Sequence, residues 1–193
     1  MIKHALLSLV IACAAAAPVA ALAEDAHVAP VRKFIASKIQ PWLTDPIVIE
    51  AIKEQNAKHA YLSQADIEKL DLAWRAQVTT ANRPLVDEVL GREISKFLAQ
   101  KQELSRGMIS ELFVMDSKGL NVGQSEVTSD YWQGDEAKWR QTYSAGPDVI
   151  YFDRAAIDES SQALQLQASL TISDPQTGEA IGAITIGINL DLL

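Results

Sequence analysis

The sequence contains a single cysteine, Cys13, among its 193 residues. One cysteine cannot form a disulfide within the chain, so the fold has to be stabilised by burial and hydrogen bonding alone. A chain of this length is large enough for that, because a domain of about 150 residues buries roughly 70% of the surface that its unfolded form exposes.

Histidine is almost as scarce as cysteine, with three residues in the chain. Only His27 and His59 lie beyond the first apolar run, and neither has a cysteine to pair with. Ser-His and Cys-His catalytic pairs and a zinc site are therefore not expected. Carboxylates occur as neighbours, such as Asp135-Glu136, and not as a pair that could face each other across a cleft. We predict that the protein is not an enzyme and needs no cofactor or metal.

Basic residues are also in the minority, because 17 Lys and Arg stand against 25 Asp and Glu, which gives a net charge of −8. They form no cluster along the chain. Nucleic acid and anionic membrane surfaces are therefore not expected as partners. After residue 23 there is no apolar run of about 18 residues, which a membrane-spanning helix would need.

The first residues have the features of a secretory signal peptide. Lys3 and His4 precede an apolar run, Ala5–Ala17, and Ala21-Leu22-Ala23 provides an A-x-A cleavage site. We predict that residues 1–23 are removed by cleavage after Ala23, and that the product is soluble and periplasmic. A lipoprotein is the alternative, since Val10–Cys13 resembles a lipid-attachment site, but the apolar run before Cys13 is short.

Residues 24–107 carry the spacing of amphipathic helices. The first is expected over residues 30–43 and should kink or end at Pro41, which has no N–H to donate. Asp45 is expected to cap a second helix over 46–59. The Ser63-x-x-Asp66 pattern predicts the start of a third helix. A fourth is expected from Pro84 to Gln100, with Gly91 as its weak point.

From Met108 the hydrophobic period changes to two, which predicts β-strands over residues 108–193. Residues 111–116 and 120–123 should form a hairpin around the turn Asp116-Ser-Lys-Gly119. Further strands are expected over 149–153, 164–172 and 180–190. The fold class is therefore α+β, with residues 24–107 as the helical segment and 108–193 as the sheet of one domain, 24–193.

The connection between the second and third strands concentrates the aromatic residues, since residues 131–152 hold six of the twelve in the chain. Charges of both signs and a glycine are mixed with them, which is typical of a recognition segment, although the aromatics could equally be core. The last strands have one apolar face and one face of small polar residues, which either meets water or leaves room for a ligand. Candidate ligand-binding residues are Tyr131, Trp132, Lys138, Trp139, Tyr143, Tyr151, Asp153, Ser169 and Thr185.

Four segments in this order resemble the Cache (PDC, PAS-like) extracytoplasmic sensor domains. They are Leu112-Phe-Val-Met-Asp-Ser-Lys-Gly119, Tyr131-Trp132, Val149-Ile-Tyr-Phe-Asp153 and Gly182-Ala-Ile-Thr-Ile-Gly-Ile-Asn-Leu-Asp191. The resemblance implies a PAS-like, five- or six-stranded antiparallel sheet with long N-terminal helices packed on one face. It also implies a small-molecule ligand, of the amino acid, organic acid or amine class, on the other face.

The resemblance further implies roles for individual residues. Tyr131 and Trp132 match an aromatic pair that helps to form the pocket, and Asp153 matches an aspartate that binds the ammonium group of an amino acid. The arginine that binds the ligand carboxylate in such domains has no counterpart, because residues 122–130 contain no basic residue. Lys138 or Arg140 could replace it.

Cache domains usually lie between two membrane helices of a histidine kinase, cyclase or chemoreceptor, and this sequence shows no second such helix. We therefore expect a periplasmic binding module for signal transduction that reports to a separate membrane-bound protein of one of these kinds. A ligand-independent interaction or dimerisation module is the alternative, in which residues 31–43 and 46–59 pair with a second copy to form a homodimer.

Overall fold

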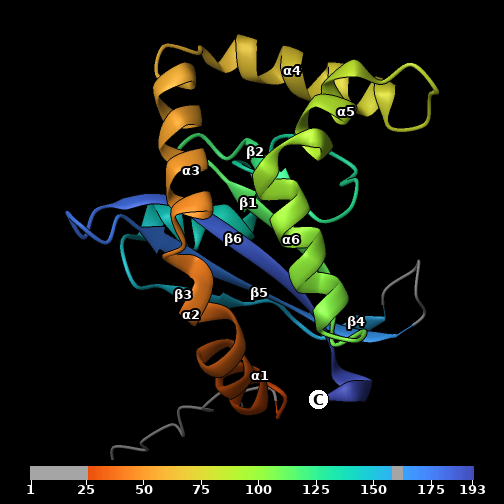
Figure 1. Ribbon diagram of the computed structural model, residues 1–193, viewed down its shortest axis with the longest axis vertical. Helices are drawn as coiled ribbons and strands as arrows, with labels where there is room; N and C mark the ends of the chain where they lie inside the picture. The colour runs from red at the N-terminus through yellow and green to blue at the C-terminus, as the bar shows by residue number, and fades with distance from the viewer. Residues whose placement is uncertain (1–25, 158–162) are drawn as a thin grey trace, which may run out of the picture.

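The computed structural model describes residues 26–157 and 163–193. The predicted signal peptide and Cys13 lie outside these residues. Helices occupy the first half of the described chain and strands the second, in the order that the sequence predicts. Figure 1 shows the helices α3 and α6 crossing one face of the sheet, while α4 and α5 form an arm beyond one of its ends.

The first helical run has three parts: α1 (Val28–Phe34), the π-helical η1 (Ile35–Ile39) and α2 (Gln40–Leu43). The chain was expected to kink or end at Pro41, and it does not end there, because the helical run continues to Leu43. Pro41 lies in the first turn of α2, directly after the π-helical turn, where a missing N–H leaves no helical hydrogen bond unmade. The wider turn thus accommodates the proline without ending the run.

The capping signals of the next two helices are confirmed. α3 (Pro46–His59) begins at Asp45, whose side chain accepts the Ile47 N–H at 2.9 Å. α4 (Gln64–Gln77) begins with a complete capping box, in which Ser63 Oγ accepts the Asp66 N–H and Asp66 Oδ2 accepts the Ser63 N–H. Both helices therefore start where local side-chain chemistry satisfies their free N–H groups.

The predicted fourth helix is two helices, α5 (Pro84–Gly91) and α6 (Glu93–Leu104). The break lies at Arg92, whose backbone is extended with ψ of 151°. Its guanidinium donates to the Gln55 side chain at 2.7 Å and to the Val122 carbonyl at 2.8 Å. These contacts to α3 and to the sheet hold the bend, so α5 packs beside α4 while α6 packs on the sheet.

The sheet has six strands, all paired antiparallel, in the order β2-β1-β6-β5-β3 with β4 also on β5. Their bounds are β1 Ile109–Met115, β2 Asn121–Gln124, β3 Ile150–Phe152, β4 Ala156–Ile157, β5 Leu164–Ser173 and β6 Ala180–Asn189. The sequence did not predict β4, which is only two residues long. An α+β fold with helices on one face of a six-stranded antiparallel sheet is confirmed.

The main core lies between the helices and one face of the sheet. The apolar alternation of the last two strands is confirmed, because Ile184, Ile186 and Ile188 face this core and have no exposed surface. A second cluster joins α4 and α5 to the connection after β2, with Trp74 at its centre. In the described part of the chain, no helix combines the length and the apolar content needed to cross a membrane. The opposite face of the sheet, called the outer face below, is left for the connection between β2 and β3 to cover in part.

Candidate functional site

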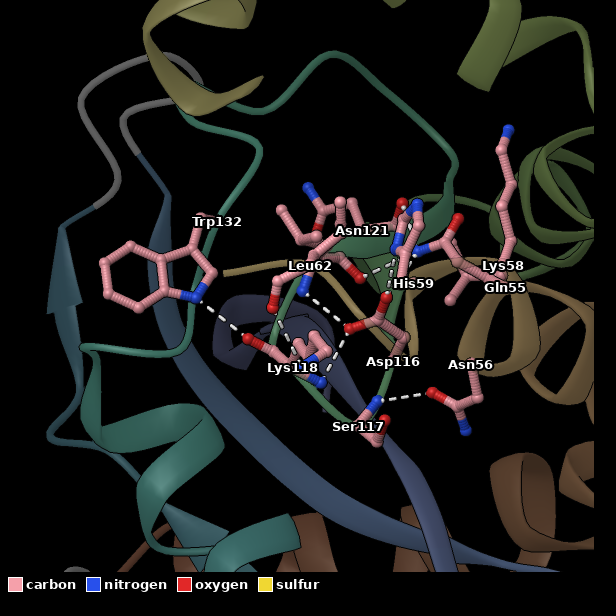
Figure 2. A network of polar contacts seen from close by, with 12 residues as sticks. Gln55, Asn56, Lys58, His59, Leu62, Asp116, Ser117, Lys118, Asn121 and Trp132 are labelled. Atoms are coloured by element: carbon pink, nitrogen blue, oxygen red, sulfur yellow. Dashed lines mark hydrogen bonds and ion pairs between the residues drawn. The ribbon is translucent and has the colours of Figure 1, made fainter. Parts of the chain in front are cut away.

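The turn between β1 and β2 fixes the position of the connection. Asp116 is fully buried, and its Oδ1 accepts the backbone N–H groups of Lys118 and Leu120 at 2.8 and 3.0 Å. Its Oδ2 lies 3.0 Å from Gln55 Nε2 and 2.8 Å from His59 Nδ1, both on α3 (Figure 2). The turn is therefore anchored to the helical layer by a buried carboxylate.

Glycines allow the connection to approach this turn closely. Gly119 has a φ of +83°, and a Cβ there would lie 2.5 Å from the Cα of Gly134. A side chain at Gly119 would thus displace the connection as well as strain the turn.

The aromatic residues of the connection divide between two places. Trp139 stacks on Tyr143 with ring centroids 5.2 Å apart, and both pack on the outer face against Phe113, Met115 and Ala183. Trp139 Nε1 donates to the Asp116 carbonyl at 3.1 Å. Trp139 and Tyr143 were considered either as ligand-binding or as packing residues, and the structure shows them packed on the sheet.

Tyr131 and Trp132 face the helical layer. Tyr131 is 2% exposed and stacks on Trp74 of α4 at 5.2 Å, and burial raises the pKa of its hydroxyl to about 12. Trp132 Nε1 donates to the Lys118 carbonyl at 2.8 Å (Figure 2). The Asp71 carboxylate accepts the backbone N–H of both residues, at 2.9 and 3.0 Å. The pair thus binds the connection to α4 and does not line the pocket described below.

Ser169 and Thr185 lie on the outer face, as the alternation predicted, but they are buried. Ser169 Oγ and Thr185 Oγ1 are 2.9 Å apart and bond each other across β5 and β6. Neither residue lines the pocket. The two hydroxyl groups therefore use each other as hydrogen-bond partners, and other residues of the outer face line the pocket.

A pocket of about 670 Å³ lies on the remaining part of the outer face. It is lined by residues of β1, β4 and β5, of the connection, and of the segment that follows β3. They are Glu111, Phe113, Val127, Thr128, Ser129, Asp130, Gln133, Lys138, Asp153, Arg154, Ala156, Ile157, Gln165 and Gln167.

Hydrogen bonds orient the charged groups of this pocket. The Glu111 carboxylate accepts from Gln165 Nε2 at 3.3 Å and from Gln167 Nε2 at 2.7 Å. Asp130 pairs with Arg75 of α4 at 3.2 Å. Lys138 pairs with Glu136 at 2.9 Å, so its charge is largely compensated within the connection.

Two further groups have unused hydrogen-bonding capacity. Gln133 is 1% exposed and donates through Nε2 to Asp130 Oδ1 at 2.8 Å, whereas its Oε1 has no hydrogen-bond partner among the described residues. Arg154 is exposed at the pocket edge and forms no ion pair within residues 26–157 and 163–193. Gln133 thus holds a buried acceptor without a partner among the described residues, and Arg154 adds an exposed cation to the pocket lining.

Asp153 lines the pocket at the end of β3, beside Tyr151. The Asp153 N–H donates to the Gln167 carbonyl at 2.9 Å, which holds the end of β3 on β5. Burial, and then the nearby Asp153 carboxylate, raise the pKa of the Tyr151 hydroxyl. Tyr151 thus contacts a pocket residue without lining the pocket itself.

Of the nine residues predicted for the site, Lys138 and Asp153 line the pocket. Sequence reasoning missed Glu111, Gln133, Arg154, Gln165 and Gln167. Gln165 and Gln167 carried a usable signal, because they alternate with apolar residues on a strand and so had to share the polar face. Arg154 follows Asp153 directly, but nothing in its local sequence indicates that this arginine lines a pocket.

Among the described residues, no group of three or more His, Cys, Asp or Glu side chains is arranged to hold a metal ion. Comparison with protein-family models found no matching family. Comparison with curated proteins found no match either.

Solved structures, in contrast, show similar arrangements of helices and strands. The sensor domain of the V. cholerae histidine kinase DctB has a TM-score of 0.47 and 16% identity, with 84% of this chain and 50% of that chain covered. The ligand-binding domain of the Campylobacter jejuni chemoreceptor Tlp3, solved with 4-methylisoleucine, has a TM-score of 0.39 and 12% identity, over 78% of this chain and 63% of that chain.

A third such structure is the ligand-binding domain of the Pseudomonas aeruginosa PAO1 amino acid chemoreceptor PctC in complex with GABA. Its TM-score is 0.36 at 14% identity, over 66% of this chain and 57% of that chain. The present chain thus spans between half and two thirds of the length of these three structures. The likeness concerns the arrangement of helices and strands. The similar structures are sensor and ligand-binding domains of histidine kinases and chemoreceptors.

Proposed function

We propose that the protein is a periplasmic sensor module that binds a small organic molecule in the outer-face pocket. The observation that carries this proposal is the pocket itself, which has about 670 Å³ of space. Small-molecule sites in proteins typically occupy roughly 300–1,000 Å³ and combine apolar walls with a few placed polar groups. Phe113 and Val127 provide apolar wall here, and oriented carboxylate and carboxamide groups provide the polar contacts.

The construction of the pocket supports binding over a purely structural role. Its charged residues come from β1, from the connection and from the end of β3, so residues distant in sequence converge on one space. Glu111 is held by two carboxamides, which fixes the direction of its carboxylate before any ligand arrives. Preorganised polar groups of this kind reduce the entropic cost of binding.

The periplasmic location and the signalling role rest on other support. The first 23 residues have the pattern of a secretory signal peptide. The resemblance to Cache domains favours a role in signal transduction through a membrane-bound kinase, cyclase or chemoreceptor. Under this proposal, the ligand-bound state of the module is what such a partner would recognise.

A thermal-shift screen of the purified chain with amino acids, organic acids and amines tests the proposal. A ligand at one hundred times its dissociation constant should add about 2.7 kcal/mol to the free energy of unfolding. Asp153→Ala should weaken the shift, whereas Arg140→Gln, an exposed change outside the pocket lining, should leave it unchanged. A complete screen without any shift would refute the proposed function.

The alternative dimerisation module finds no specific support in the first helical run. Its residues Val31, Ile35 and Ile39 have no exposed surface, because they pack into the main core of the same chain. The apolar stripe that could have paired with a second copy is therefore already buried. Size-exclusion chromatography with light scattering tests this alternative directly.

A further inference from the structure

The helical side of the sheet carries a groove of its own, called the helical groove below. It has a volume of about 410 Å³ and is lined by residues of α3, α5, α6 and β2, together with Arg92 at the bend between α5 and α6. Figure 1 shows α3 and α6 as the two helices that cross this side of the sheet. The helical groove shares no lining residue with the outer-face pocket. A molecule bound here would therefore not compete with a ligand on the outer face.

The floor of the helical groove is apolar. Ile94 of α6 and Val122 of β2 are each 2% exposed and belong to the main core. Ile47 and Ala51 lie one turn apart on α3, are partly buried and pack against the same core cluster. When an amphipathic helix binds in a groove, its apolar face makes contacts of this kind. The groove thus offers apolar contact along one turn of α3.

Both cations of the lining are already paired. Arg92 Nη2 lies 3.0 Å from Glu88 Oε1, and its Nη1 donates to Gln55 Oε1 at 2.7 Å and to the Val122 carbonyl at 2.8 Å. Lys58 Nζ lies 4.0 Å from the same Glu88 oxygen. One carboxylate therefore serves both cations of the groove.

Three other carboxylates of the lining have no cation. Glu50 and Glu54 of α3 and Glu93 of α6 are exposed and form no ion pair in the part of the chain that the structure describes. Glu50 and Glu54 are four residues apart on one helix, and like charges at this spacing repel each other. Lys53, which neighbours them on α3, pairs instead with Asp174 at 2.9 Å. The apolar floor thus lies between two walls with uncompensated negative charge.

The complement of such a groove is a helix with an apolar stripe and basic residues beside it. A helix rises about 1.5 Å per residue, so Glu50 and Glu54 are separated by about 6 Å along α3 and match two Lys or Arg residues of the same spacing. A second copy of this chain does not supply that charge, because its net charge is −8 and its Lys and Arg residues form no cluster along the sequence. The complementary helix therefore belongs to a different protein.

We propose that the helical groove docks a basic amphipathic helix of a partner protein. The apolar residues of that helix lie on Ile94 and Val122, and its Lys or Arg side chains face Glu50, Glu54 and Glu93. Charge complementarity of this kind steers association, so the association rate falls as the salt concentration rises. The outer face stays open, so the partner and a ligand bind at the same time.

Two fluorescently labelled peptides of 14 residues, the length of α3, test this docking by anisotropy with the purified chain. Both consist of the same leucine, lysine and alanine residues. In the first, leucines recur at three and four residues with lysines beside them, so that a helix presents both on one face; in the second, the order is scrambled. We expect the amphipathic peptide to bind at least about tenfold more tightly than the scrambled one, which corresponds to about 1.4 kcal/mol.

Variants of the chain locate the contact. The double variant Glu50→Gln, Glu54→Gln should weaken the amphipathic peptide at least about tenfold, and both positions are exposed, so this variant is expected to fold. The double variant Glu68→Gln, Glu103→Gln removes the same charge from exposed positions outside the groove and should leave the affinity unchanged. Ala51→Trp fills the groove without a change of charge and should weaken binding at least as much as the first variant.

Three results would overturn the proposal. Equal affinity of the two peptides would mean that net charge alone attracts them, and equal affinity of the two double variants would place the contact outside the groove. The proposal also fails if neither peptide binds at about 1 mM. If 1,5-diaminopentane displaces the amphipathic peptide as effectively as unlabelled peptide does, the groove is a site for small cations and not for a helix. None of these results affects the proposed function, which depends on the outer-face pocket and on the thermal-shift screen.

Discussion

Removal of the Asp116 carboxylate should destabilise the protein more than any surface change of the same size. The side chain is fully buried and makes four polar contacts of 2.8–3.0 Å, two to backbone N–H groups of its own turn and two to side chains of α3. Asp116→Ala leaves these groups without their acceptor. Each buried donor without a partner costs about 1–3 kcal/mol, and breaking a buried charged contact from one side costs about 3–5 kcal/mol.

We therefore expect Asp116→Ala to lower the free energy of unfolding by about 3–5 kcal/mol, because water can reach part of the loosened turn. Asp116→Asn retains an acceptor for the two turn N–H groups and loses the charge that faces α3, so about 1–3 kcal/mol is expected. Urea unfolding followed by tryptophan fluorescence measures both. Asp135→Ala, an exposed aspartate of the connection, is the matched control. A loss below about 1 kcal/mol for Asp116→Ala would refute the reasoning.

Three further predictions concern the groups around the connection and the last hairpin. Burial raises the pKa of the Tyr131 hydroxyl from 10.0 to about 12, so its contribution to stability is fully present below pH 10 and is lost as the pH rises toward about 12. Ultraviolet absorbance should show one tyrosine that ionises at higher pH than the others, and Tyr131→Phe should remove this step. Trp139→Ala removes the stack on Tyr143 and the packing on the outer face and should cost about 2–4 kcal/mol in urea unfolding, whereas Trp139→Phe should recover at least half. Hydrogen bonds from the Gln176 N–H and from Lys53 lower the pKa of Asp174, so this carboxylate stabilises the fold at pH values above its ordinary pKa of 3.8, and this stabilisation is lost as the pH falls below 3.8. Asp174→Asn should therefore make the free energy of unfolding less dependent on pH in the acid range. An unchanged pH profile of stability would contradict this.

Local chemistry made much of the fold predictable. The caps at Asp45 and Ser63 act within three residues, and the turn at Asp116 uses that residue's own side chain, the turn backbone and one glycine. The break at Arg92 could not be predicted in the same way. Its extended backbone is held by Gln55 and Val122, which lie 37 and 30 residues away along the chain. Gly91 indicated a weak point, but only the tertiary contacts turn it into a bend.

The position of the pocket followed from the sequence only in part. The alternation in the last strands correctly indicated a polar outer face, and the aromatic stretch correctly indicated a segment that packs on a sheet. Aromatic character does not reveal which surface a side chain will meet, so Tyr131 was predicted beside a ligand and instead stacks on Trp74, 57 residues earlier in the sequence. Ser169 and Thr185 were predicted as ligand-binding residues, and they are buried and bond each other across β5 and β6.

Hydrogen–deuterium exchange with and without a ligand found in the thermal-shift screen tests the central claim most directly. The account predicts slower exchange in the segments that line the outer-face pocket, over residues 109–115, 127–138 and 150–157, and little change over α3. Slower exchange confined to α3, α5 and α6, with the outer face unchanged, would contradict the account, because the ligand would then bind on the helical side of the sheet.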